Sequence, residues 1–350
     1  MRILFVLPAP VRVPSGGASV VYQHAKGLVE RGHEVTVVAP NRMNGLPGVA
    51  RAAAQRLRNR WHGVAERPLW APEGVRTVEV ASPKGLNIDS YESVIATGHQ
   101  TAPWVHRAMG ERVSGRVYFI QGDERYQTPL AEATWDLPFT RISISHWLAD
   151  VLAEHGAPVA AVIPNAVDRE TFTCTNPPEG REPRVIALYH RLPVKGPDTL
   201  IDALTRLKPL VPEVQATVIT ARPPQHRLPS WVSVRIRPDA DSLVELYNRA
   251  AVCLHTSRLE GWGLVPMEAA ACGCAVVATA SRGVSEYLAD GRSMLQVNVG
   301  DANGLATHTA RLLAHPEERA HLAQAGIEDV SRFSWESSTS RLESVLKAAL

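Results

Sequence analysis

The chain has 350 residues, of which 45% are hydrophobic and 21% charged, so we expect two soluble globular domains. A formal net charge of +2 does not indicate nucleic-acid binding, which usually requires a strongly basic surface. No stretch approaches the ~18 apolar residues of a membrane span, and the apolar start Met1–Pro8 is too short for a signal peptide. The four cysteines lack the spacing of a zinc site. We therefore expect a cytoplasmic protein.

Short apolar runs alternate with helical patterns in the first half of the chain. This is the rhythm of βαβ units around a parallel sheet. The pattern predicts strands at Ile3–Leu7, Glu34–Ala39, Val75–Val80, Ser93–Ala96, Val117–Ile120, Ile142–Ser145 and Ala161–Ile163, with helices at Ala18–Arg31 and Trp147–His155.

A second series of the same kind follows a polar, proline-rich segment at 173–183. We expect a first domain at 1–168 and a second at 169–334, with ligands at the carboxyl ends of the strands. The pattern predicts strands at Val185–Tyr189, Val214–Thr220, Val232–Ile236, Val252–Leu254 and Ala275–Thr279, and helices at Thr199–Leu207, Ser242–Ala250, after Pro266 and at Trp335–Leu350.

Two carboxylates lie on either side of a glycine-containing turn in the second half. The apolar run Ala251–His255 predicts a buried strand, and a helix is expected to begin at Leu264–Pro266. The N-terminus of a helix presents free N–H groups that favour phosphate. Glu260 precedes this helix and Glu268 lies in its first turns, so the pair could bracket a ligand with a diphosphate, a sugar and a ribose.

This segment resembles the Glu-seven-residues-Glu signature of the retaining family 4 glycosyltransferases. The resemblance implies the GT-B architecture, in which two Rossmann-like parallel-sheet domains face across a cleft. It implies sugar transfer from a nucleoside-diphosphate sugar to an acceptor hydroxyl, with retention of configuration and without a metal or other cofactor. Glu260 would then bind donor-sugar hydroxyls, Glu268 the ribose, and the amides of Gly263, Leu264 and Val265 the phosphates. In this family the helix at 335–350 commonly crosses back to the first domain.

Arg191 and Lys195 follow the predicted strand Val185–Tyr189 in a turn that opens a helix. The turn resembles the family's Gly-Arg-Leu…Lys-Gly pattern, although Tyr189-His190 stands where a glycine is common. Two cations here could stabilise the charge that builds on a departing nucleoside diphosphate. By itself, such a pair is more often a solvated surface feature.

The first domain carries weaker signals. Gly16 and Gly17 resemble the family's Gly-Gly loop and would let the backbone approach a donor. The loop Gln121–Tyr126 has Gln121 where many members place a histidine. Asp123 or Glu124 could orient an acceptor hydroxyl or the sugar, or could simply form a polar loop. We expect His99 to have a structural role.

Two further patterns have alternative interpretations. Asp239-Ala240-Asp241 is similar to a metal-binding Asp-x-Asp motif, but its position before a helical pattern favours a helix start. The basic run 51–62 could contact anionic lipid at the inner membrane face, although a solvated helix or loop fits it better.

The resemblance indicates a bacterial enzyme of cell-surface glycan or natural-product glycosylation. The missing histidine keeps open a non-catalytic nucleotide-sugar binding module, and the fold keeps open an epimerase or hydrolase. A nicotinamide oxidoreductase is disfavoured because the G-x-G-x-x-G fingerprint is missing. The donor base, the sugar and the acceptor are not specified by the sequence.

Overall fold

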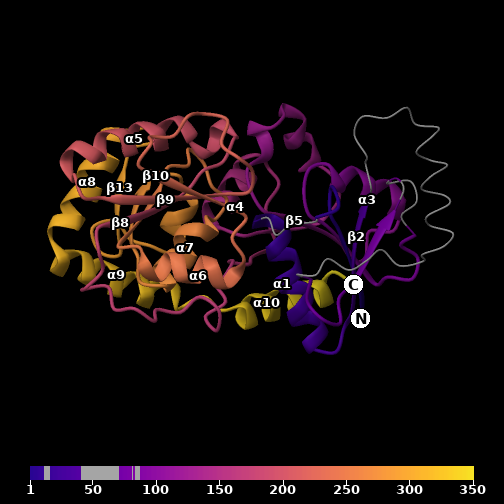
Figure 1. Ribbon diagram of the computed structural model, residues 1–350. Coiled ribbons are helices and arrows are strands. Elements are labelled where there is room, and N and C mark those ends of the chain that lie inside the picture. Colours follow the sequence, from indigo (N-terminus) through magenta and orange to yellow (C-terminus); the bar gives the residue numbers. More distant parts are fainter. Residues whose placement is uncertain (12–15, 41–70, 81, 83–86) are drawn as a thin grey trace, which may run out of the picture. The chain divides into compact units, whose positions relative to one another are not determined.

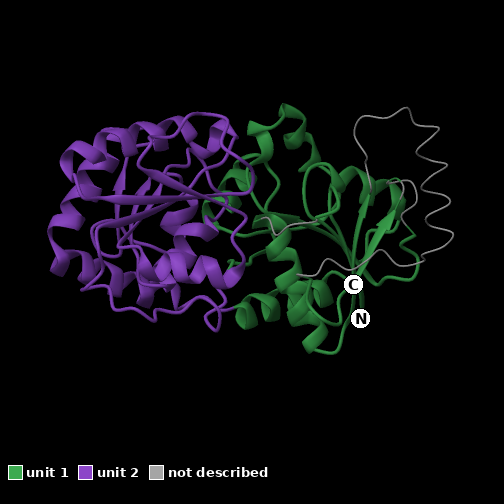
Figure 2. Ribbon diagram, viewed as in Figure 1, with its two compact units in different colours: residues 1–165, 335–350 green, residues 166–334 purple. Residues whose placement is uncertain are grey.

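The computed structural model describes residues 1–11, 16–40, 71–80, 82 and 87–350 (Figure 1). The described chain divides into two compact units (Figure 2). The first comprises Met1–Asn165 with Trp335–Leu350, and the second comprises Ala166–Ser334. The basic run 51–62, for which lipid contact was considered, lies outside the described residues.

In its described part, the first unit is built on a parallel sheet with the strand order β3-β2-β1-β4-β5-β6-β7. The chain runs outward from β1 to β3 and then returns to the other side of β1, which creates a topological switch point between β1 and β4. The strands are β1 (Arg2–Val6), β2 (Glu34–Pro40), β3 (Arg76–Val80), β4 (Ser93–Ala96), β5 (Arg116–Ile120), β6 (Thr140–Ser143) and β7 (Ala161–Val162).

Helices α1 (Gly16–Glu30), α3 (Thr101–Met109), α4 (His146–Glu154) and α10 (Trp335–Ala348) belong to this unit, with short 3-10 turns η2 (Glu124–Tyr126) and η3 (Pro129–Thr134). The C-terminal helix α10 packs against α1. A Cβ added at Gly27 of α1 would lie 2.9 Å from Oγ1 of Thr339, so the glycine allows this close approach. The buried ring of His24 lies edge-on to Trp335 of α10, with ring centroids 5.4 Å apart.

The second unit has the same design within residues 166–334. Its parallel sheet has the order β10-β9-β8-β11-β12-β13, with a switch point between β8 and β11. The strands are β8 (Arg184–Leu188), β9 (Gln215–Thr220), β10 (Val232–Ile236), β11 (Val252–His255), β12 (Ala275–Thr279) and β13 (Met294–Val297). The helices are α5 (Pro197–Leu210), α6 (Ala240–Arg249), α7 (Leu264–Ala271), α8 (Ala302–Ala314) and α9 (Pro316–Val330), with 3-10 turns η4 (Pro193–Lys195) and η5 (Gly283–Glu286).

The core of the second unit explains why the central strands are apolar along their whole length. Helix α5 packs against α8, and α7 against α9, and these layers cover a sheet whose strands β11 and β12 are fully buried. Strands covered on both faces read as continuous hydrophobic runs, which is the pattern that predicts a parallel sheet. Two Rossmann-like parallel sheets are thus confirmed.

The sequence pattern missed α3, β13, α8 and α9. Much of the buried face of α9 consists of small residues, including Ala320, Ala323, Ala325 and Gly326, which give a weak hydrophobic signal. Helix α3 carries Pro103 in its first turn, where a proline is tolerated because its missing N–H has no helical partner.

Helix α6 starts where the Asp-x-Asp pattern predicts a helix start. Oδ1 of Asp239 accepts a hydrogen bond of 2.9 Å from the backbone N of Ser242, which makes Asp239 the N-cap. The helix-start interpretation is therefore confirmed. Among the described helices, none is both long and apolar enough to cross a bilayer.

Candidate active site

The connections after β8, β11 and β12 meet at one edge of the second sheet. These strands are neighbours in the order β8-β11-β12, so their carboxyl ends lie together at the switch point. Lys195 follows β8, Glu260 follows β11, and Arg282 follows β12. Glu260 is tied to the last connection, because its backbone N donates a 2.9 Å hydrogen bond to the carbonyl of Ser281.

Lys195 and Glu260 form a bidentate ion pair at this edge. The Lys195 Nζ lies 2.8 Å from Oε1 and 2.7 Å from Oε2 of the carboxylate. The Glu260 residue is only 9% exposed, so its charge is largely removed from water and depends on the ammonium group. The structure thus brings together two residues that are 65 positions apart in sequence.

Two further side chains approach the Glu260 carboxylate. Ser257 donates a 2.7 Å hydrogen bond to Oε1, and Nε2 of His255 lies 3.7 Å from the same oxygen. Burial lowers the pKa of His255 to about 4, so its ring is neutral near pH 7. Burial would raise the pKa of Glu260, but Lys195 and the hydrogen bonds outweigh it and lower the pKa. Lys195 supplies the compensating charge, because His255 is uncharged.

The turn between Glu260 and α7 depends on two glycines. Gly263 has φ of 92°, in the left-handed region that favours glycine, and serves as the N-cap of α7. A Cβ at Gly283 would lie 2.7 Å from both the backbone N and O of Trp262. The Trp262 ring stacks on Tyr287 at a centroid distance of 5.3 Å, which supports the turn from inside the unit.

Glu268 lies on α7, eight residues beyond Glu260. Its Oε2 accepts a 3.1 Å hydrogen bond from the hydroxyl of the fully buried Tyr247. Burial raises the pKa of Glu268 to about 7, and the Tyr247 hydrogen bond opposes this only in part. The two carboxylates therefore differ: Glu260 is fixed as an anion, while Glu268 is poised to gain or lose a proton near neutral pH.

Arg191 is held apart from this ion pair. Its guanidinium donates hydrogen bonds to the carbonyl of Pro223, from Nε at 3.2 Å and from Nη2 at 2.5 Å. Tyr189, at the position where a glycine was expected from the resemblance, is fully buried and its hydroxyl lies 2.8 Å from Nδ1 of His226. Tyr189 and Arg191 together hold the segment after β9 against the end of β8.

In the first unit, Gly17 and Gln121 lie close together at the carboxyl edge of the sheet. A Cβ at Gly17 would lie 3.3 Å from Oε1 of Gln121, and this buried oxygen has no hydrogen-bond partner among the described residues. Gly16, which begins α1, has open space at its Cβ position.

The Asp123 carboxylate makes local contacts. It accepts hydrogen bonds from Nε and Nη2 of Arg125 at 2.9 and 2.8 Å and caps the turn η2. Glu124 turns the other way, toward His99, whose backbone N donates a 2.6 Å hydrogen bond to Oε2. The His99–Glu124 contact links the loops after β4 and β5, and no spacing pattern predicts it because the two residues are 25 positions apart.

The second unit matches a known family over nearly all of its length. Residues 169–329 match the profile described as glycosyl transferases group 1. The second unit is a glycosyl transferases group 1 domain.

Relatives of the chain include named transferases. The chain is 30% identical over 200 residues to D-inositol 3-phosphate glycosyltransferase from Stackebrandtia nassauensis, a match covering 50% of this chain and 45% of the relative. The chain thus spans less than half the length of that relative. It is 27% identical to phosphatidyl-myo-inositol mannosyltransferase from Mycolicibacterium smegmatis over 96% of this chain and 90% of the relative.

Solved structures share the fold of both units. Sucrose-phosphate synthase from Thermosynechococcus elongatus superposes with a TM-score of 0.79 at 18% identity, covering 99% of this chain and 98% of that one. The Anabaena protein HepE, solved in complex with UDP-glucose, gives 0.76 at 18% identity and covers 99% of this chain and 100% of its own. The chain therefore has the GT-B fold, with two Rossmann-like units.

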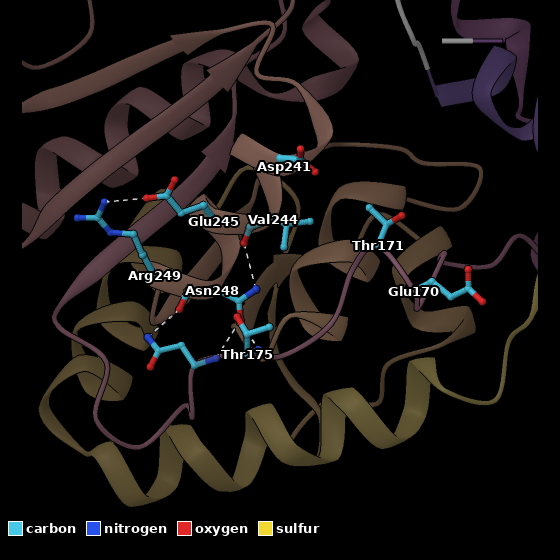
Figure 3. A pocket seen from close by; sticks show the side chains of 9 residues that line it. Glu170, Thr171, Thr175, Asp241, Val244, Glu245, Asn248 and Arg249 are labelled. Carbon is cyan, nitrogen blue, oxygen red and sulfur yellow. Dashed lines mark hydrogen bonds and ion pairs between the residues drawn. The ribbon is translucent and has the colours of Figure 1, made fainter. Parts of the chain in front are cut away.

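A surface pocket of about 630 Å³ lies elsewhere on the group 1 domain, between α6 and the segment at 170–176 (Figure 3). Glu245 and Arg249 form an ion pair on its wall, while the buried amide of Asn248 holds the backbone of Thr175. None of the predicted site residues lines this pocket. The charged groups Glu245 and Arg249 are paired with each other and the Asn248 amide is bound to the backbone, so this pocket is a weaker candidate than the edge that carries Lys195 and Glu260.

Proposed function

We propose that the chain transfers a sugar from a nucleoside-diphosphate sugar to an acceptor hydroxyl, with retention of anomeric configuration. The observation that carries this proposal is the Lys195–Glu260 pair at the switch point of a group 1 domain, with Glu268 on the following helix. A cation and a helix N-terminus are suited to bind a diphosphate, and two carboxylates are suited to bind the hydroxyl groups of a sugar and a ribose.

Each residue has a role in this proposal. Glu260 would accept hydrogen bonds from donor-sugar hydroxyls, and Glu268 from the ribose. Lys195 would bind the diphosphate together with the first amides of α7, at Gly263, Leu264 and Val265. Arg191 would join them by exchanging its hydrogen bond with the Pro223 carbonyl for one with a phosphate oxygen. Gly16 and Gly17 would also bind the donor.

The reaction breaks the bond between the anomeric carbon and the diphosphate oxygen, whose electron pair leaves with the nucleoside diphosphate. The acceptor oxygen forms the new bond on the same face of the sugar, and its proton passes to the departing phosphate. Asp123 would orient the acceptor hydroxyl. We propose that Lys195, Arg191 and the α7 amides balance the charge of the leaving group, so that no divalent metal is needed. Full activity in EDTA would agree with this.

The names of the relatives direct the search for the acceptor. One relative is named for inositol 3-phosphate and another for phosphatidyl-myo-inositol, so phosphorylated inositols are the first acceptors to test. A membrane-bound acceptor would place the protein at the inner membrane face, in keeping with bacterial cell-surface glycosylation. A small natural product with a free hydroxyl is the second class of acceptor.

The test begins with a thermal-shift panel of UDP, GDP, dTDP and ADP and their common sugars. A ligand at 100 times its dissociation constant stabilises the folded protein by about 2.7 kcal/mol. The selected donor is then incubated with and without acceptor, in wild type and in Glu268→Ala. Loss of a charge-assisted hydrogen bond should weaken donor binding by roughly 1.5–3 kcal/mol.

The outcomes separate the alternatives. Transfer to an acceptor with retention supports the proposal. Donor turnover without acceptor indicates a hydrolase or epimerase, and nucleotide binding without any turnover indicates a binding module. No shift with any nucleotide, or unchanged donor affinity in Glu268→Ala, would overturn the assignment of the donor site.

A further inference from the structure

His255 lies next to Glu260 and has a buried ring nitrogen that makes no hydrogen bond to any described residue. The nitrogen is Nε2, the residue is 4% exposed, and Oε1 of Glu260 lies 3.7 Å from this nitrogen. A buried polar atom without a partner destabilises the folded state, so such a group calls for an explanation.

Two groups compete for the ammonium group of Lys195: the Glu260 carboxylate and the diphosphate of the proposed donor. Its Nζ now holds both carboxylate oxygens of Glu260, yet the proposed function also requires this ammonium group to bind the diphosphate. The Lys195 side chain is 26% exposed and long enough to turn outward, whereas Glu260 is fixed by its backbone bond to Ser281. When Lys195 turns to a phosphate, the Glu260 carboxylate loses a partner in a place with little water.

We propose that His255 is a positioning residue that takes hold of Glu260 when Lys195 moves to the diphosphate. A neutral imidazole with its proton on Nε2 closes the 3.7 Å gap by a small side-chain shift and donates to Oε1 beside Ser257. Oε2 is then free to accept from a sugar hydroxyl. Diphosphate binding and sugar recognition become coupled, because the same movement of Lys195 that binds phosphate releases one carboxylate oxygen.

This inference rests on the proposed function, but part of its test does not. In ring-¹⁵N-histidine NMR, the His255 signal is assigned by its loss in His255→Gln. Lys195→Met removes the ammonium group without any ligand, so the Nε2–H of His255 should become protected from solvent exchange and shift downfield. Inorganic pyrophosphate added to wild type should produce the same change by drawing Lys195 away.

Kinetics supply the second readout. His255→Leu should lower kcat/KM for the nucleotide sugar about tenfold and weaken binding of the free nucleoside diphosphate several-fold, because Lys195 can then leave Glu260 only without a replacement donor. His255→Gln keeps a donor group and should recover activity to within about threefold. A merely structural histidine would weaken diphosphate binding in the Lys195→Met background as well, where the proposed role predicts no further loss.

The failures are distinguishable. An unchanged His255 signal in Lys195→Met, or a His255→Leu variant equal to wild type, overturns the role of His255 alone. A protected signal in Lys195→Met, with no response of wild type to pyrophosphate or to any nucleotide sugar, overturns the proposed function and the coupling with it. Weaker diphosphate binding in His255→Leu that persists in the Lys195→Met background shows only structural damage and also overturns the inference.

Discussion

The hydroxyl of Tyr247 donates a hydrogen bond of 3.1 Å to Oε2 of Glu268, and burial raises the pKa of this carboxyl group to about 7. Both groups lie on adjacent helices of the second unit, α6 and α7. An acid with a raised pKa favours the folded state in its protonated form. The pair therefore makes stability and donor binding depend on pH in opposite directions.

The first prediction concerns stability. Glu268 stabilises the fold fully below its ordinary pKa of 4.5, and this contribution is lost as the pH rises toward about 7. Glu268→Gln mimics the protonated form. Its free energy of unfolding, relative to that of wild type, should therefore increase by on the order of 2 kcal/mol from pH 5 to pH 8. Denaturation curves at both pH values measure this, and Glu245→Gln, on the exposed Glu245–Arg249 pair, is the matched control.

The second prediction concerns the donor. A ribose hydroxyl binds the ionised carboxylate better, so the Kd for a nucleotide sugar should fall several-fold as the pH rises from 6 to 8. Calorimetry should use the nucleotide sugar, because the terminal phosphate of a free diphosphate titrates near pH 6. In Glu268→Gln the dependence should disappear, and its persistence would place the titrating group elsewhere.

The third prediction tests the ion pair of the donor site. Lys195→Met leaves the Glu260 charge buried without its partner and should cost about 2–3 kcal/mol of unfolding free energy. The double variant Lys195→Met with Glu260→Gln should recover much of this loss. The exposed pair Arg206–Asp202 is the control, and Arg206→Met should change stability by less than about 0.5 kcal/mol. Additive losses in the double variant would contradict the pairing.

The fourth prediction tests the turn that carries Glu260. Gly283→Ala places a methyl group 2.7 Å from backbone atoms of Trp262 and 2.8 Å from the carbonyl of Glu260. Because the backbone of the turn must shift, we expect the free energy of unfolding to fall by about 2–3 kcal/mol. Donor affinity should fall as well. Gly180→Ala meets no atom within 4 Å and should behave like wild type. Donor binding that survives Gly283→Ala unchanged would argue against this turn as part of the site.

The fifth prediction separates two roles of Asp123. If this carboxylate orients the acceptor, Asp123→Ala should lower transfer about tenfold by raising the acceptor KM, without changing donor Kd. Arg125→Ala removes the ion pair between Arg125 and Asp123 and should lower transfer by no more than about threefold. Equal losses in the two variants would show that Asp123 serves only to hold Arg125.

The sequence predicted the parallel sheets well, because strands buried on both faces are apolar throughout. The fully buried strands β4 and β12 begin and end at the predicted residues. The sequence pattern did not predict α9, because small residues make up much of its buried face. It was also weak where a polar side chain makes long-range contacts, as with His255 at the end of an apolar run. That ionisable residue in an otherwise buried strand was the available signal.

The sequence by itself determined the residue types of the candidate donor site and their order: a lysine after β8, two glutamates eight positions apart, and glycines at the turn. These features follow from local chemistry, because turns, helix starts and hydrophobic periodicity depend on residues that are neighbours in sequence. Only the tertiary structure decided that Lys195 pairs with Glu260, that Arg191 is held by Pro223, and that Glu268 lies in surroundings that raise its pKa. Distance, burial and charge compensation arise between residues far apart in sequence, so they exist only once the chain has folded.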